Sequence, residues 1–391
     1  MRPPVRDPGL ASPGGQTAAA FAPDRRPELA APQPHARATL RLKPGDETAV
    51  ADLTLDLQNS RRTRFSSGYL NDGIAPLSEH RFFAGVEGSD WFGLPWWFTG
   101  QFFMDADVSS YHSAQVAQRF FLPWHHELRL YGAWTRAVVD GEIAAPLDSS
   151  TAESWQASAR YLVPLPAWKR WKTDAGIGID LRRTNNNVEF GGTSLGGDAD
   201  IIQFAGEISS ERHTEKSDSG WRFEGIYSPG NLTTNQTDAV HNDFRPGAQA
   251  DYLLGRAALW HRQWLGEWSV TGRVSGQVAS APVLPSEQIG LGGSYAIRGF
   301  PEATFLGDTG CWGSLEIQAP QWEWHKLQMQ PVVFAEGGWV HDAARHEDAS
   351  PAGAGCGIRL QWGRHVSCNA DYAWRLTEPG GRFHVAIRME F

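Results

Sequence analysis

A single arginine, Arg298, stands in a glycine-rich and aromatic stretch, LGGSYAIRGFPEATFLGDTG, which covers residues 291–310. This composition predicts a loop that is neither helix nor strand. The guanidinium of an arginine is permanently charged and offers a planar fork of donors that fits a carboxylate. If the loop folds against other protein, the charge of Arg298 needs an acidic partner, because an unpaired buried charge is costly.

Two glutamates on the following predicted strands are candidate partners. In VVFAEGGWV, period-two alternation puts Glu336 on the same face as Phe334 and Gly338. In SLEI, Glu316 alternates with apolar residues. A glutamate in the middle of a membrane-spanning strand is costly toward lipid, so in a barrel both would face inward. Arg298 is expected to bind Glu336 or, failing that, Glu316, and so to pin the tip of its loop to the wall.

Other chemistries find little support. The three cysteines, Cys311, Cys356 and Cys368, form neither a CxxC pair nor an even-numbered framework, so a metal site is not expected. No GxSxG motif occurs, and the histidines of WHHE at 124–127 belong to a predicted turn, where a structural role is favoured over catalysis. A net charge of −9 without clusters of Lys or Arg argues against nucleic acid as a partner. We therefore assign no catalytic, cofactor-binding or metal-binding residue and expect no enzyme.

Composition limits the elements that can position the arginine. The 391 residues include 42 Gly, 18 Trp and 19 Phe, yet the mean hydropathy is only −0.40. No run reaches the roughly 18 apolar residues of a membrane-spanning helix, which excludes a helical membrane protein. Strands that alternate between lipid and a wet interior give such an average, because half of their residues stay polar.

Period-two alternation is the strongest signal in the chain. The last ten residues, RFHVAIRMEF, place five apolar side chains on one face and Arg382, His384, Arg388 and Glu390 on the other. The apolar five are expected to face outward: Phe383, Val385, Ile387, Met389 and Phe391.

Sixteen segments of this kind follow residue 61. An even number is typical of a closed bacterial outer-membrane barrel. We predict an all-β fold, a 16-stranded antiparallel transmembrane β-barrel over 61–391, closed by pairing of its first and last strands. The predicted strands are 62–72, 80–92, 95–107, 110–122, 127–138, 151–164, 170–185, 199–212, 219–229, 248–264, 267–280, 309–320, 326–341, 352–362, 365–376 and 382–391.

Connection lengths and tryptophans agree with a barrel. Alternate connections are short, as at 93–94, 124–126 and 363–364, and the others are longer, up to the sixth long loop at 281–308. Eleven tryptophans flank the short turns, as an aromatic belt at the membrane boundary requires. A soluble β-sandwich would not concentrate them beside alternate turns. The eleven are Trp91, Trp96, Trp97, Trp124, Trp168, Trp171, Trp264, Trp268, Trp322, Trp324 and Trp362.

Several of these motifs together resemble the barrel of the haemolysin secretion/activation family, the transporters of two-partner secretion. The motifs are LGGSYAIRGF, GDTG, SLEI, FAEGG and a C-terminal strand that ends in phenylalanine. In that family an Arg-Gly-Phe/Tyr loop enters the lumen, and its arginine meets the acidic residue of a Phe-x-Asp-x-Gly strand. Arg298, Gly299 and Phe300 match the loop motif. The strand motif is matched by Phe334, Glu336 and Gly338, with glutamate in place of aspartate.

The resemblance extends from about residue 38 to the end. ATLRLKPGDETAVADLTLDLQ resembles the last hairpin of a POTRA domain, so 37–60 is interpreted as a POTRA remnant. Residues 1–36 are rich in Pro and Ala and are expected to be disordered, since their six-residue apolar core is too short for a signal peptide. Two interpretations stay open: the chain starts downstream of its true beginning, as a truncated transporter, or residues 1–36 are a disordered tail.

The resemblance implies an outer-membrane translocation pore that exports an unfolded exoprotein of the haemolysin or adhesin type. Its partners would be that cargo, outer-membrane lipid and lipopolysaccharide, and the barrel-assembly machinery, which would meet the C-terminal strand. No cofactor and no nucleic acid are expected. Two alternatives keep the fold: an assembly factor that inserts other barrels, and a passive porin.

Overall fold

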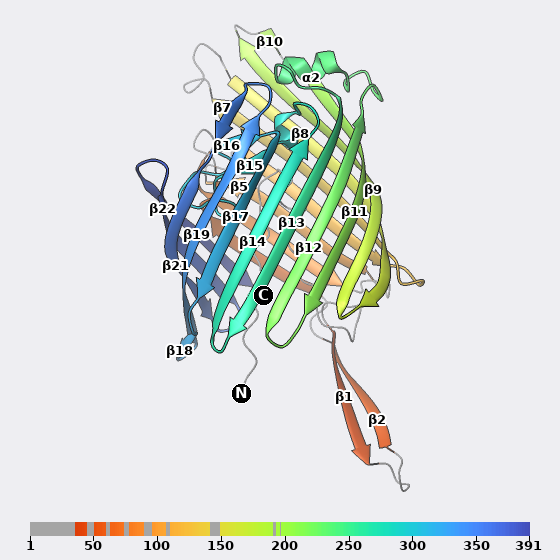
Figure 1. The fold of residues 1–391 in the computed structure, drawn as a ribbon, viewed down its shortest axis with the longest axis vertical. Helices are drawn as coiled ribbons and strands as arrows, with labels where there is room; N and C mark the ends of the chain where they lie inside the picture. Colours follow the sequence, from red (N-terminus) through yellow and green to blue (C-terminus); the bar gives the residue numbers. More distant parts are fainter. Residues whose placement is uncertain are drawn as a thin grey trace.

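The computed structural model describes residues 36–44, 51–59, 63–73, 78–89, 96–106, 110–140, 149–190, 193–195 and 197–391. Sixteen long strands form one closed antiparallel barrel (Figure 1). This confirms the fold predicted from alternation. The expectation of disorder for 1–36 falls on residues that lie, except for Ala36, outside these ranges.

Each predicted strand corresponds to one long strand of the barrel. Three further strands, β10 (Thr193–Leu195), β18 (Trp322–Trp324) and β20 (Glu347–Ala349), only extend the sheet at its rims. The sixteen long strands are β3 (Thr63–Leu70), β4 (Arg81–Ser89), β5 (Trp96–Asp105), β6 (Tyr111–Phe121), β7 (Glu127–Asp140), β8 (Ser149–Trp168), β9 (Trp171–Phe190), β11 (Asp198–His213), β12 (Ser217–Pro229), β13 (Asp251–Leu265), β14 (Trp268–Ala279), β17 (Thr309–Gln318), β19 (Leu327–Asp342), β21 (Ala352–Trp362), β22 (Val366–Arg375) and β23 (Gly381–Glu390).

Alternation along the strands separates two environments. In β19, Phe334 and Glu336 are buried on the inner face, whereas Val333 is 51% exposed and Trp339 is exposed on the outer face. Charged side chains of the lumen pair across strands, as Arg160 does with Asp180 and Arg359 does with Asp371. An apolar outer band around a polar interior is what a barrel in a membrane requires.

The barrel closes between its first and last strands. Ser66–Leu70 of β3 pair with Ala386–Glu390 of β23. Beyond that ladder, the backbone of Phe391 exchanges two hydrogen bonds with the backbone of Phe65, at 2.9 and 3.4 Å. The pairing leaves neither strand with an exposed edge.

The two rims differ as predicted. Tight turns at 169–170 and 266–267 occupy one rim, and α2 (Asp238–Phe244) lies in a long loop at the other (Figure 1). The predicted turn at 93–94 and Trp91 lie outside the described ranges. Six of the eleven tryptophans are strongly exposed beside the short turns, and these are Trp124, Trp168, Trp268, Trp322, Trp324 and Trp362.

Three features differ from the expectations. The predicted loop 186–198 begins later, because β9 continues to Phe190 and pairs with β10. The loop at 230–247 contains α2, whose first turn is capped by Thr237. The stretch expected to lack regular structure contains β15 (Ile289–Leu291) and β16 (Phe305–Gly307), which pair with each other. In each case backbone hydrogen bonding outweighs a polar or glycine-rich composition.

A separate hairpin precedes the barrel. β1 (Ala36–Pro44) pairs with β2 (Ala51–Asn59) along its whole length. Its interpretation as a POTRA remnant stays a prediction. Among the residues whose structure is described, no helix is long and apolar enough to cross a membrane.

Candidate functional site

The loop between β14 and β17, residues 280–308, folds into the barrel and packs against its inner wall. Leu291, Ile297 and Phe300 of this lumen loop are almost completely buried and form an apolar cluster with Val340 of β19. Side chains of a loop that hung outside would be solvated instead. The loop therefore occupies part of the lumen.

Arg298, at the tip of this loop, is 5% exposed and contacts three carboxylates. Its Nε and Nη2 atoms donate to one oxygen of Glu336, at 3.0 and 2.5 Å. Its Nη1 atom donates to Asp371 at 3.0 Å and to Glu316 at 3.2 Å. The backbone N–H of Arg298 donates to the second oxygen of Glu336 at 2.7 Å. The structure thus brings Arg298 to both glutamates that the sequence singled out, and adds an aspartate.

Neighbouring groups hold the three carboxylates in place. Arg359 of β21 bridges two of them, with 2.5 Å to Asp371 and 3.3 Å to Glu316. Ser314 donates to Glu336 at 3.1 Å. Each carboxylate has at least one donor other than Arg298, so the acceptors are partly oriented by the wall itself.

The aromatic ring of Phe334 packs against the guanidinium of Arg298. The guanidinium of Arg298 lies 3.3 Å from the centre of its ring, which is a cation–π contact in a largely dry environment. Gly338, the last residue of the strand motif, leaves space for the loop, since a Cβ there would lie 2.8 Å from the side chain of Leu291. In the strand motif, Glu336 therefore binds the charge of Arg298, Phe334 stacks against it, and Gly338 leaves space for the loop.

The other two residues of the loop motif fix the backbone. Gly299 has a φ of +103°, a conformation that other residues rarely adopt. Its N–H donates to His384 at 3.1 Å, and its carbonyl accepts from Arg375 at 2.7 Å. Phe300 is 1% exposed and packs edge-on against Phe305, with ring centres 5.2 Å apart.

Sequence reasoning missed two contributors, Asp371 and Arg359, and placed His384 on the polar face of its strand without connecting it to the loop. The available signal was parity, because Asp371 stands in mid-strand opposite the outward-facing Tyr372. That signal places a carboxylate in the lumen, yet it does not say which loop residue will reach it.

The C-terminal strand alternates as expected. Phe383, Met389 and Phe391 are exposed on the outer face, and Val385 and Ile387 are half-buried between them. His384 is buried on the inner face, and Arg388 contacts Glu390 at 2.9 Å.

The turn at WHHE is held by side-chain hydrogen bonds and stays largely exposed. His126 and Trp124 both hydrogen-bond to the hydroxyl of Tyr161, at 2.6 and 2.9 Å. In the part of the chain that the structure describes, no three His, Cys, Asp or Glu side chains gather in a way that would hold a metal ion.

Residues 50–360 match the family model described as Haemolysin secretion/activation protein ShlB/FhaC/HecB. The fold is similar to CdiB from Escherichia coli, with a TM-score of 0.77, 14% identity and coverage of 90% of this chain and 67% of that chain. It is also similar to CdiB from Acinetobacter baumannii, with a TM-score of 0.70, 14% identity and coverage of 91% and 66%.

A more distant similarity is to BamA from Haemophilus ducreyi lacking POTRA domains 1-3, with a TM-score of 0.57, 11% identity and coverage of 91% and 76%. At these identities the structures show a shared fold alone. The chain spans about two thirds of the length of the two CdiB structures. No curated protein matches the sequence significantly.

Proposed function

Because this chain belongs to the haemolysin secretion/activation family, we propose that its barrel exports an unfolded partner exoprotein by two-partner secretion. The chain is an outer-membrane β-barrel. The cargo would be of the haemolysin or adhesin type and would pass through the lumen to the cell surface. Folding of the cargo outside would drive the export, since the outer membrane has no nucleotide supply.

The observation that carries the proposal is the seated lumen loop. Passive diffusion needs an open lumen, whereas here a buried arginine on three carboxylates holds a loop inside it. Here the Arg298 contact acts as a latch that keeps the loop across the lumen at rest. Release of the latch would open a path for an extended chain.

The remaining partners follow from the surface of the barrel. The outer apolar face would contact outer-membrane lipid and lipopolysaccharide. The C-terminal strand, with Phe383, Val385, Ile387, Met389 and Phe391 on its outer face, would be presented to the barrel-assembly machinery. We propose no catalytic role, no cofactor and no nucleic-acid partner.

Deletion of the gene in its own bacterium tests the function. The proteins of the medium and the cell surface are measured by mass spectrometry before and after complementation with wild type, Arg298→Ala or, as a control, Arg345→Ala. Arg345 is an exposed arginine of another loop. If the barrel exports a partner, the deletion strain should lose one or a few large exoproteins. Wild type and Arg345→Ala should restore them, whereas Arg298→Ala should restore them poorly. Loss of many outer-membrane barrels would instead indicate an assembly factor, and an unchanged exoproteome would contradict export.

A further inference from the structure

The lumen loop is bound at a second point, near its beginning, by a charge of the opposite sign. Glu287, the last residue of the 3-10 turn η3 (Pro285–Glu287), is fully buried. Its carboxylate forms an ion pair with Arg182 of β9 and accepts from Arg256 of β13 at 3.3 Å. Gln203 of β11 donates to it at 3.0 Å. At this point a carboxylate of the loop binds arginines of the wall. At Arg298 the signs are reversed, since a cation of the loop binds carboxylates of the wall.

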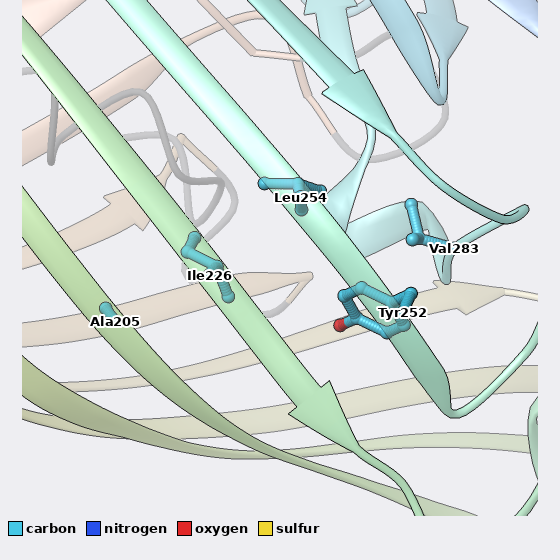
Figure 2. Close-up of a cluster of buried hydrophobic side chains, with 5 residues drawn as sticks. All are labelled: Ala205, Ile226, Tyr252, Leu254 and Val283. Atoms are coloured by element: carbon cyan, nitrogen blue, oxygen red, sulfur yellow. The ribbon is translucent and has the colours of Figure 1, made fainter.

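Apolar packing supports this second point. Val283, four residues before Glu287, is completely buried against Tyr252 and Leu254 of β13 and against Ile226 of β12 (Figure 2). Its N–H donates to Asp308 at 2.9 Å. Residues 283–287 are therefore bound to β9–β13 by both charge and apolar contact, and we call them the loop foot.

The other end of the loop is also fixed. Asp308, the residue before β17, receives two hydrogen bonds from Arg245, at 2.7 and 2.8 Å. Arg245 follows α2 and also contacts Asp342 of β19 at 2.6 Å. The loop thus has two bound ends, at Glu287 and Asp308, and the latch residue Arg298 between them.

The foot lies in a cluster with equal numbers of opposite charges. Around Glu287, three acidic groups meet three arginines: Arg160 joins Asp180 at 2.6 Å and Glu224 at 3.2 Å, beside Arg182 and Arg256. Removal of Glu287 would leave buried arginines in excess, which is costly.

At the latch, Arg298 and Arg359 contact three carboxylates, Glu316, Glu336 and Asp371. Arg273 of β14 also interacts electrostatically with Glu316 and Glu336, so this cluster too has three arginines for three carboxylates. Loss of Arg298 leaves an excess of carboxylates, which protons or water can relieve, whereas loss of Glu287 leaves an excess of arginines, which stay charged. The foot is therefore the harder site to dissociate.

We propose that Glu287 is a permanent anchor of the lumen loop, and that release of Arg298 frees only residues 289–307 while the loop foot stays docked. The loop then opens as a flap hinged at the foot and at Asp308. Glu287 is a positioning residue in this scheme. The inference rests on the proposed function for its purpose, but the motion can be measured without any cargo.

Amide hydrogen exchange of the purified barrel in detergent tests the motion, because local opening is read separately at each amide. The N–H groups of Val283 and Glu287 report on the foot, since they bond to Asp308 and to the Leu284 carbonyl. The N–H groups of Ser294 and Arg298 report on the tip, since they bond to Glu302 and Glu336. Arg298→Ala should speed exchange at the tip by about tenfold or more and change the foot by less than about twofold. Equal acceleration of foot and tip would overturn the proposal.

Glu287→Gln gives the converse test, with Glu267→Gln, an exposed glutamate in a tight turn, as the matched control. Exchange at the foot should rise about tenfold in Glu287→Gln and stay unchanged in the control. Glu287→Asp keeps the charge and should restore part of the protection from exchange at the foot. If Glu287→Asp and Glu287→Gln lose the same protection, an anchor based on charge is contradicted. If Glu287→Gln forms no barrel, Gln203→Leu removes one bond to the carboxylate and should loosen the foot selectively, and no loosening would count against the anchor.

Failure of the proposed function and failure of the anchor are distinguishable. An unchanged exoproteome with exchange confined to the tip in Arg298→Ala would refute export and leave the hinged loop intact. Impaired export in Arg298→Ala, with exchange accelerated equally at foot and tip, would support export and refute the hinged loop.

Discussion

Arg298 neutralises a site that the rest of the barrel leaves negative. Without it, Glu316, Glu336 and Asp371 would share two arginines: Arg359, which contacts Glu316 and Asp371, and Arg273, whose charge acts on Glu316 and Glu336. Like charges at this distance repel, and removal of one member of a buried ion cluster typically costs about 3–5 kcal/mol. Lumen water would lower that cost as soon as the loop withdraws, so the latch is strong in the seated state and reversible.

Arg298→Lys tests the geometry of the latch. Lysine keeps the charge, but it replaces a planar fork that reaches all three carboxylates with a single point charge. We expect the tip amides to exchange faster than in wild type and more slowly than in Arg298→Gln. A lysine variant as well protected as wild type would show that charge alone holds the loop. Arg345→Lys serves as the control.

Glu302 makes the loop tip sensitive to pH. Burial, followed by the charge of Asp72, raises the pKa of Glu302 to about 7, and hydrogen bonds from Ser294 offset this only in part. The positive charge of Arg81, which lies 3.9 Å from Asp72, also lowers the pKa of Glu302, and it too offsets the rise only in part. Because the protonated form is favoured in the seated loop, this contribution to seating is full below about pH 4.5 and is lost as pH rises through about 7.

We therefore expect channel openings in planar bilayers to be more frequent at pH 8 than at pH 5.5. Glu302→Gln should flatten the dependence, whereas Glu267→Gln should keep it. A dependence that survives in Glu302→Gln would assign the titration to another group.

At the scale of the elements, the seam between β23 and β3 requires a glycine at one position. A Cβ on Gly68 would lie 2.1 Å from the carbonyl oxygen of Ile387 on the facing strand. That oxygen belongs to backbone and cannot move without opening the ladder. Gly68→Ala should destabilise the barrel by about 1–3 kcal/mol.

The measurement is the temperature at which the barrel loses its compact migration on gels. Gly206→Ala on β11 is the matched control, because a Cβ there meets no atom within 4 Å. A Gly68→Ala barrel as heat-resistant as the control would show that the seam can adjust.

The strands were largely predictable because lipid and lumen impose opposite preferences on successive residues. β23 shows this directly: its alternation predicted both its outer face and its inner His384. Beyond the membrane that constraint ends, and β9 continues through residues 186–190, which composition assigns to a loop. There the ladder with β8 decides, through backbone bonds that the sequence does not display.

At the scale of the whole molecule, the site depends on contacts that no local pattern encodes. The partner of Glu287, Arg182, is 105 residues away, and that of Arg298, Asp371, is 73 residues away. Parity indicates that the strand residues Arg182 and Asp371 face the lumen. Only the closed barrel, which sets the order and stagger of the strands, decides which loop residue each one meets.

This arrangement predicts how the pore responds to the loss of each attachment. Wild type should stay mostly closed in planar bilayers, since the loop is held at its foot, at Asp308 and at the latch. Arg298→Ala should open often and close again, because a flap with both ends bound remains in the lumen. Arg298→Ala combined with Glu287→Gln should give openings at least about tenfold longer, since a missing buried contact worth about 1.4 kcal/mol changes an equilibrium tenfold. A wild-type pore with a large, steady conductance would contradict closure by the lumen loop. Identical current traces for the single and double variants would mean that Glu287 does not restrain the released loop.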